Sequence, residues 1–188
     1  MLRLFTAITL PAAIAQRLAR MGGGIPGARW VAEENLHLTL RFIGETDRHA
    51  ADRVHEALGA VVFSPFEVRL QGTATFGERK PRLLYAGVAA SPELLQLYEK
   101  VVTALSRAGV ASPNGRRYVP HVTLARLNNA PRDRIGGFIA ENNILNIAPF
   151  RAEHFVLMSS HASAKGASYQ IEARYPVSRN AVRAGLPD

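Results

Sequence analysis

The chain has 188 residues, enough for one large domain or two small lobes, and its 47% hydrophobic and 20% charged residues are typical of globular proteins. It contains no cysteine, which excludes disulfides, thiolate metal sites and a cysteine nucleophile. The formal net charge of +8 is carried mostly by arginine, which favours a polyanionic substrate, although a GC-rich coding sequence would produce the same composition. With no apolar run as long as a membrane span and no export signal, we expect a cytoplasmic protein with no membrane partner.

The first half of the chain alternates strand and helix patterns. Pro11 fits the first turn of a helix, and three consecutive glycines at 22–24 end that helix. Gly44 is expected to end the strand before the second helix. The expected elements are a strand at 3–10, a helix at 11–21, a strand at 36–43, an amphipathic helix at 47–62, a strand at 66–70 and a loop or hairpin at 72–81.

The second half repeats this order. Its expected elements are a strand at 82–88, a helix from Pro92 that Gly109 ends, a polar loop at 112–117, a strand at 118–126, a short helix at 131–141, a strand at 154–158 and a last strand at 168–177. We therefore predict one two-lobed domain over 1–188, built from an internal duplication of roughly 3–72 and 82–158.

The phrase His-x-Thr-Leu occurs once in each half, at 37–40 and at 121–124. Because alternate side chains of a strand share a face, the histidine and threonine of each phrase lie on one face, about 6.5 Å apart. The same alternation puts Arg41 on the site face and Phe42 in the core. It puts Arg126 on the opposite face, unless the second strand ends or bulges before it.

Two histidines in one cleft suit general acid–base catalysis without a metal. The unperturbed pKa of imidazole is about 6.5, so one ring can be protonated while the other is neutral at cellular pH. The neutral ring would take a proton from water, and the charged ring would protonate the leaving oxygen of a phosphodiester. Threonine hydroxyls and arginines nearby would bind the nonbridging oxygens.

Two stretches of this sequence resemble the signature strands of the two-histidine phosphoesterases: HLTLRFIGE at 37–45 and YVPHVTLAR at 118–126. Similarity continues through Arg29-Trp30-Val31, through PRLLY at 81–85 and into the tail from 157 to 177, so it covers most of the chain. The sequence is most similar to the RNA 2′,3′-cyclic phosphodiesterase family, also called the bacterial 2′–5′ RNA ligase-like family.

The resemblance implies an α+β fold with two pseudo-twofold lobes, mainly antiparallel sheets lining a central cleft, and helices outside. It implies that a monomer without cofactor or metal hydrolyses the 2′,3′-cyclic phosphate at an RNA end to a 2′-phosphomonoester. By analogy His37 would be the general acid that protonates the departing 3′ oxygen, and His121 the base that activates water, although the sequence alone leaves these two roles unassigned. The remaining residues that the resemblance places at the substrate are Thr39, Thr123, Arg41 and Arg126.

Several alternatives stay open at this point. The protein could act on a small cyclic nucleotide, bind RNA without turnover, or ligate RNA through 2′–5′ bonds. A metal site made by His37 and His121 with His154 or His161 finds no supporting ligand motif, and no phosphate-binding loop indicates an ATP-dependent ligase. His161 is expected near a turn that could border the cleft. Trp30 is expected either to pack in the core or to stack on a base.

Overall fold

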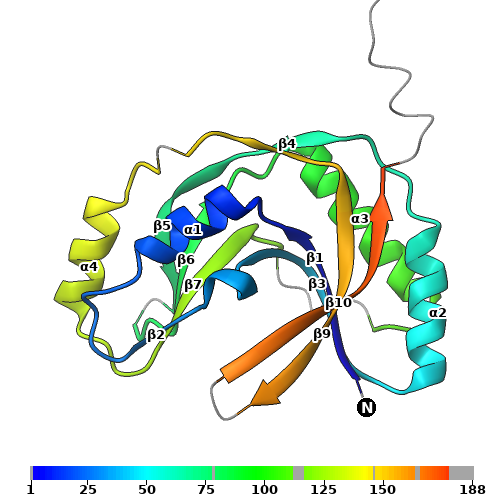
Figure 1. The fold of residues 1–188 in the computed structure, drawn as a ribbon, viewed down its shortest axis with the longest axis horizontal. Helices are drawn as coiled ribbons and strands as arrows, with labels where there is room; N and C mark the ends of the chain where they lie inside the picture. Colours follow the sequence, from blue (N-terminus) through cyan, green and yellow to red (C-terminus); the bar gives the residue numbers. More distant parts are fainter. Residues whose placement is uncertain (1, 78, 112–116, 146, 164–165, 178–188) are drawn as a thin grey trace, which may run out of the picture.

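The computed structural model describes residues 2–77, 79–111, 117–145, 147–163 and 166–177, and the α+β fold class is confirmed (Figure 1). The elements in chain order are β1 (Leu2–Thr9), α1 (Ala12–Arg20), β2 (Ala28–Trp30), the 3₁₀ helix η1 (Glu33–Asn35), β3 (His37–Thr46), α2 (Arg48–Gly59), β4 (Phe66–Val68), β5 (Leu70–Phe76), β6 (Leu83–Val88), α3 (Pro92–Arg107), β7 (His121–Leu127), α4 (Arg132–Glu141), β8 (Phe150–Ala152), β9 (His154–Ser163) and β10 (Gly166–Pro176).

Local sequence signals fix where the helices begin. The Asp47 carboxylate accepts a hydrogen bond of 2.8 Å from the Ala50 amide and so caps α2. The Ser91 hydroxyl accepts one of 3.3 Å from the Leu94 amide and caps α3. Pro11 and Pro131 occupy the residue before α1 and α4, where a missing backbone N–H costs no helical hydrogen bond.

The large sheet is antiparallel throughout, with the strand order β10-β9-β1-β3-β7-β6-β5 and β2 paired to β7. The two motif strands, β3 and β7, are therefore neighbours at its centre. Each half of the chain contributes a strand to the other half's side of the sheet: β5 belongs to the first half of the chain but pairs with β6, whereas β9 belongs to the second half but pairs with β1.

A second sheet contains only β4 and β8, in which Phe66 faces Ala152 and Val68 faces Phe150. These two strands come from corresponding places in the two halves, and each leads directly into a strand of the large sheet, β4 into β5 and β8 into β9. This arrangement supports the internal duplication, which we retain as a proposal.

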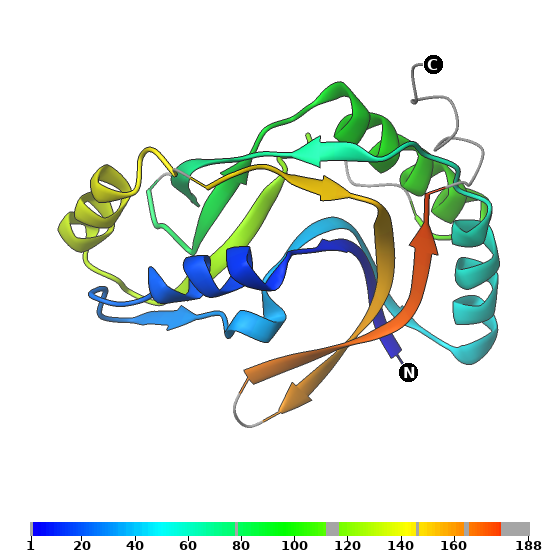
Figure 2. The same cartoon turned by 45° about the horizontal axis from the view of Figure 1, so that its top comes forward.

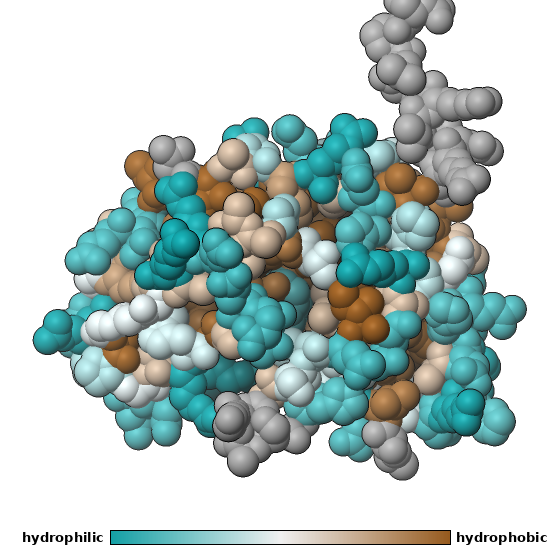
Figure 3. Space-filling model, viewed as in Figure 1, coloured by the Kyte–Doolittle hydropathy of each residue, from teal (hydrophilic) through white to brown (hydrophobic). Residues whose placement is uncertain are grey.

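The helices cover one face of the curved sheet. In Figures 1 and 2, α2 and α3 lie together at one end of it, and α1 and α4 lie at the other. Buried side chains of all four helices join the main core with alternate residues of β1, β3, β6 and β7. A smaller cluster of Phe5, Ala7, Val156 and Met158 lies on the other face. The face drawn in Figure 3 is mostly hydrophilic, with small separate hydrophobic patches. Within the described residues, no helix is long and apolar enough to cross a membrane.

Several boundaries differ from the sequence expectations. β3 does not end at Gly44 but runs on to Thr46, because Gly44 adopts a φ of +97° beside a register irregularity instead of ending the strand. The expected loop from 72 begins as strand β5, which continues to Phe76. Gly72 lies at a register shift there, where an added Cβ would stand 2.5 Å from the Asn143 carbonyl oxygen. β7 starts only at His121, and β9 is longer than expected. Most of the expected loop at 112–117 lies outside the described residues.

Candidate active site

β3 and β7 meet at one cross-strand pair, Leu38 with Val122, and both side chains are buried in the main core. Residues directly opposite each other in an antiparallel pair share a face of the sheet, and their neighbours along each strand point to the other face. The neighbours of this pair are the histidine and threonine of each motif. The four side chains that the structure brings to one face are those of His37, Thr39, His121 and Thr123.

The register of this pair also sets the spacing between the two imidazoles. Continued by one residue in each direction, it puts Thr39 opposite His121 and His37 opposite Thr123. The Cα atoms of the two histidines are then diagonal neighbours, about 7–8 Å apart. At this spacing a single phosphate group between the strands can contact both rings.

Both imidazoles are oriented by the same backbone contact. Nδ1 of His37 lies 2.7 Å from the carbonyl oxygen of Asn35, and Nδ1 of His121 lies 2.7 Å from that of Val119. A carbonyl oxygen only accepts hydrogen bonds, so each Nδ1 carries a proton and donates it. Nε2 is consequently the nitrogen of each ring that can exchange a proton with a substrate, as a base when neutral and as an acid when charged.

Burial lowers the pKa of both histidines. The pKa of His37 lies below its ordinary value of 6.5 because burial disfavours the imidazolium; the hydrogen bond to Asn35 opposes this, and a positive charge on His121 lowers the pKa further. Burial also lowers the pKa of His121, against the opposing effect of the hydrogen bond to Val119. Because the two charges repel each other, a state with one proton shared by the pair is favoured over the doubly charged state.

Aromatic rings hold each imidazole from two sides, which restricts its rotation and excludes water. One of the two rings in each case comes from an edge strand of the large sheet, β10 or β5, and the other from the strand that pairs with the motif strand, β1 or β6. The contacts, with ring-centroid distances, are His37–Phe5 (4.9 Å), His37–Tyr169 (5.1 Å), His121–Phe76 (4.9 Å) and His121–Tyr85 (5.3 Å).

A bulge in β7 decides where Arg126 lies. Thr123 faces Tyr85 and Ala125 faces Leu84, so Leu124 is an extra residue in the pairing. Leu124 and Ala125 are consequently both buried, and the alternation restarts with Arg126 exposed on the histidine face. From the sequence, Arg126 was expected on the histidine face only if the second motif strand ended or bulged before it, and the structure contains such a bulge. Arg29, directly opposite Arg126 on β2, shares this face.

A bulge of the same kind occurs in β3 and changes the faces of Phe42 and Arg41, although Arg41 still lines a hollow that contains Thr39 and His121. Thr39 faces Ala7 and Arg41 faces Thr6, so Leu40 is the extra residue. Phe42 therefore emerges on the histidine face with 63% of its surface exposed, and its expected place in the core is wrong. The simple alternation that put Arg41 on that face no longer holds, and its Nη2 donates a 2.7 Å hydrogen bond to the Ala111 carbonyl.

Three hollows open beside the motif residues. The first, of about 430 Å³, is lined by Thr39 and His121 from the motifs and by Phe42. The second, of about 280 Å³, contains Arg29 and Arg126, and the third, of about 460 Å³, contains His37. Volumes above about 300 Å³ are usual for small-molecule sites. The first hollow is reached from both motif strands, through Thr39 of β3 and His121 of β7, and the first two hollows each contain two arginines.

Comparison with known proteins places this geometry in a family. The profile of the 2′-5′ RNA ligase superfamily matches residues 10–163. The chain belongs to this superfamily. A curated relative from Aeropyrum pernix named RNA 2′,3′-cyclic phosphodiesterase is 36% identical over 121 residues, which cover 61% of this chain and 68% of the relative. A relative of the same name from Archaeoglobus fulgidus is 26% identical over 173 residues, covering 90% and 97%.

Solved structures share the fold of this superfamily member. A Thermus thermophilus protein aligns with a TM-score of 0.77 and 27% identity, covering 93% of this chain and 97% of the other. E. coli LigT, solved in complex with 3′-AMP, aligns with a TM-score of 0.73 and 26% identity, covering 95% and 99%.

The remaining histidines of this superfamily member lie outside the paired site. His161 and Ser159 lie on the same face of β9, and the Ser159 hydroxyl is 2.9 Å from Nε2 of His161. Met158 lies on the opposite face of β9, which is the histidine face, so His161 does not border the paired site. Nε2 of His154 lies 3.2 Å from the Thr9 hydroxyl. Among the described residues, no three metal-ligating side chains of the His, Cys, Asp and Glu types gather into one group.

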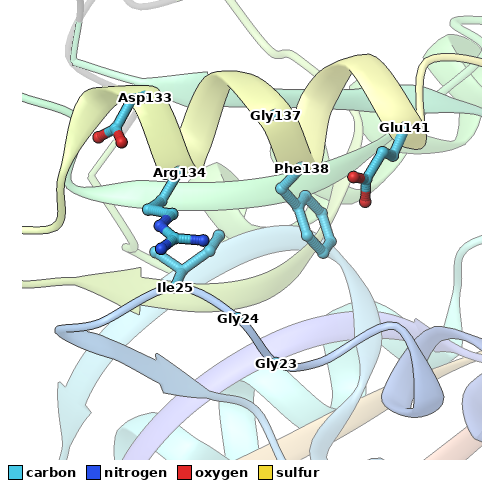
Figure 4. A pocket seen from close by; sticks show the side chains of 8 residues that line it. All are labelled: Gly23, Gly24, Ile25, Asp133, Arg134, Gly137, Phe138 and Glu141. Carbon is cyan, nitrogen blue, oxygen red and sulfur yellow. The ribbon is translucent and has the colours of Figure 1, made fainter.

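A further hollow, of about 370 Å³, lies between the 23–25 loop and α4, away from both motifs (Figure 4). It is lined by Asp133, Arg134 and Glu141, and it contains none of the motif residues. Trp30, close by, packs on Phe138 with ring centroids 5.4 Å apart, which is the packing role that the sequence allowed.

Sequence reasoning missed the aromatic residues that hold the site. Phe5, Tyr85 and Phe76 reach the histidines only through strand pairing, so a signal for them exists only once the pairing partners are known. Tyr118 stands out in the sequence only as part of the second motif. Its hydroxyl donates a 2.9 Å hydrogen bond to the Thr39 carbonyl, which ties the segment before β7 to β3.

Proposed function

We propose that this protein hydrolyses the 2′,3′-cyclic phosphate at an RNA end to a 2′-phosphomonoester, by metal-independent acid–base catalysis between His37 and His121. The observation that carries the proposal is the matched pair of imidazoles on neighbouring strands, each with Nδ1 bonded to a backbone carbonyl. The curated relatives named RNA 2′,3′-cyclic phosphodiesterase support the choice of substrate.

In the proposed reaction, Nε2 of His121 takes a proton from a water molecule as its oxygen forms a bond to phosphorus. The bond between phosphorus and the 3′ oxygen breaks, and Nε2 of His37 gives its proton to that oxygen. The product carries a 2′-phosphate and a free 3′-hydroxyl, and the protons balance across the pair. This division of roles follows the family resemblance.

The singly protonated pair is the form that the reaction requires. Repulsion between the two rings disfavours the doubly charged form, so one acid and one base coexist between the two macroscopic pKa values of the pair. The negative charge of a bound cyclic phosphate would favour the single imidazolium. Acid–base terms of this kind contribute about 10²–10⁴-fold to rate.

The threonines and Arg126 complete the proposed phosphate site. Thr39 and Thr123 lie on the histidine face, each two residues from its histidine, where a hydroxyl can donate to a nonbridging oxygen. Arg126 adds a fixed positive charge at the end of the same face. Together these donors would stabilise the extra negative charge that forms at phosphorus.

End-group analysis tests this proposal. An oligoribonucleotide ending in a 2′,3′-cyclic phosphate is incubated with the protein in excess EDTA, and the product ends are identified. We expect conversion to 2′-phosphate at an undiminished rate. A 3′-phosphate product would reverse the leaving-group assignment, and loss of activity with recovery on metal addition would contradict metal independence.

A further inference from the structure

The two carbonyl groups that orient the imidazoles lie outside the strands that carry the histidines. Asn35 ends η1, and β3 begins two residues later at His37. Val119 likewise stands two residues before His121, where β7 begins. The strand pairing of the large sheet does not extend to Asn35 or Val119. The pairing that fixes each histidine therefore leaves its acceptor carbonyl to be held by other contacts.

Tyr118 holds the segment that contains Val119. Its hydroxyl donates a hydrogen bond of 2.9 Å to the Thr39 carbonyl of β3. Its ring stacks on that of Tyr98 from α3, with centroids 4.0 Å apart and an angle of 2° between the planes. Burial raises the pKa of the Tyr118 hydroxyl, so this group stays protonated and remains a donor at neutral pH. The residue next to Val119 is thereby tied to the first motif.

Asn35 makes the corresponding contact on the His37 side. Its carbonyl oxygen lies 2.7 Å from Nδ1 of His37, and its side-chain Nδ2 donates a hydrogen bond of 3.1 Å to the Ala167 carbonyl of β10. Because a carbonyl only accepts, the amide nitrogen must be the group that faces Ala167. Two residues further along β10, Tyr169 packs edge-on against His37. Asn35 thus connects the acceptor of His37 to the strand that carries one of the rings around it.

The position of the ring proton depends on these contacts. A neutral imidazole has one proton, and its Nε2 can take a proton from water only while the first stays on Nδ1. An imidazolium that has given up the proton of Nε2 is left with the one on Nδ1, so the same carbonyl serves the acid and the base. If the carbonyl moved away, the proton could occupy Nε2 and the ring could turn. Loss of the tie would then reduce the fraction of competent protein without removing any group that touches the phosphate.

We propose that Tyr118 and Asn35 are positioning residues for the reaction, each of which holds the backbone carbonyl that keeps one imidazole protonated on Nδ1. Tyr118 acts on His121 through Val119. Asn35 acts on His37 through its own carbonyl. The inference rests on the proposed function, since these contacts serve proton transfer at Nε2. Because the two ties run to different strands, β3 and β10, removal of one should disturb one ring only.

Nitrogen-15 NMR of the free protein tests the positioning directly. Tautomers are measured at about pH 8, where both rings are neutral because burial lowers their pKa values. In Tyr118→Phe, which keeps the ring and its stacking, we expect His121 to lose part of its Nδ1-protonated form while His37 keeps it. Asn35→Ala should have the opposite selectivity. Each variant is thus the control for the other ring.

Kinetics on an oligoribonucleotide ending in a 2′,3′-cyclic phosphate give the functional effect. Each variant is expected to lower kcat about 2- to 10-fold, the range for loss of one neutral hydrogen bond, with KM unchanged. Tyr175→Phe is the matched control, because it also removes one tyrosine hydroxyl contact, of 2.8 Å to Nδ1 of His55, on the helix-covered face of the sheet. This control should leave kcat and both tautomers as in the wild type.

Unchanged tautomers of His37 and His121 in both variants would overturn the proposal. Equal changes at both rings in either variant would also overturn it, and so would a loss of kcat no larger than that of Tyr175→Phe. The NMR measurement needs no substrate. Wild-type protein that fails to hydrolyse the RNA end would therefore refute the proposed function, a result distinct from failure of the positioning role.

Discussion

Leu38 and Val122 form the cross-strand pair at which β3 and β7 meet, and neither side chain is exposed to solvent. This contact lies directly behind the four motif side chains, so the packing of two aliphatic residues sets the spacing of the two imidazoles. The geometry of the proposed catalytic pair is therefore a consequence of core packing, and it should respond to changes that never touch the substrate.

Truncation of Leu38 tests this dependence. Leu38→Ala removes a fully buried side chain from the main core, and we expect the free energy of unfolding to fall by about 2–5 kcal/mol. Urea denaturation measures this loss. The exposed control Val62→Ala should change the unfolding free energy by no more than about 0.5 kcal/mol. A cost below about 1 kcal/mol for Leu38→Ala would contradict the buried position of this pair.

The pH dependence should follow the lowered pKa values. Both imidazoles lose their protons at a lower pH than a free histidine, because burial disfavours their charged forms. The free pair therefore gains its single proton only as the pH falls below about 6.5, and a second proton at still lower pH inactivates the base. We expect a bell-shaped profile of kcat/KM with its optimum below about pH 6.5. An optimum above about pH 7.5 would contradict the direction of both shifts.

The interaction between the two rings can be measured separately by NMR titration. In His121→Gln the repulsion that lowers the pKa of His37 is removed, so this pKa is expected to rise relative to the wild type. The matched variant His49→Gln changes an exposed histidine of α2 and should leave the His37 titration unchanged. An unchanged or lower His37 pKa in His121→Gln would mean that the rings are too far apart to share a proton.

The two arginines that follow the motifs should differ in effect. Arg126→Ala is expected to lower kcat/KM on RNA about 10- to 100-fold, in line with about 1.5–3 kcal/mol for a hydrogen bond to a charged group. Arg41→Ala should cost less, since its guanidinium already bonds the Ala111 carbonyl. Arg69→Ala, in the surface pair with Glu67, is the control for lost positive charge. A larger effect for Arg41 than for Arg126 would contradict the placement that the bulges give them.

The alternation of side chains along a strand was enough to predict that the histidine and threonine of each motif share a face. The phrase His-x-Thr-Leu contains both the buried and the exposed face of a strand, so the shared face of His37 and Thr39 follows from three residues of sequence. The helices were predictable for a similar reason, because Asp47 and Pro92 are local signals for where a helix begins.

The bulges could not be predicted in the same way. Leu40 is the extra residue of the bulge in β3, and it is buried, as simple alternation along the strand also predicts. The apolar pattern of the sequence therefore gives no sign of the bulge. Only the partner strand reveals the extra residue, and the side chains between it and the second register shift, at Ile43, change face. For this reason Phe42 was expected in the core and Arg41 on the site face. The rings around the histidines depend on long-range pairing for the same reason.

The central claim is that His37 and His121 together perform the reaction, and single-turnover hydrolysis by His37→Asn and His121→Asn tests it most directly. Each variant is mixed in excess with an oligoribonucleotide ending in a 2′,3′-cyclic phosphate, in EDTA, and RNA affinity is measured in parallel. His49→Asn serves as the control. We predict that each motif variant loses at least about 10²-fold in rate, the lower bound for acid–base catalysis, while its RNA affinity stays within a few-fold of wild type. Wild-type-like hydrolysis by either variant would contradict the account.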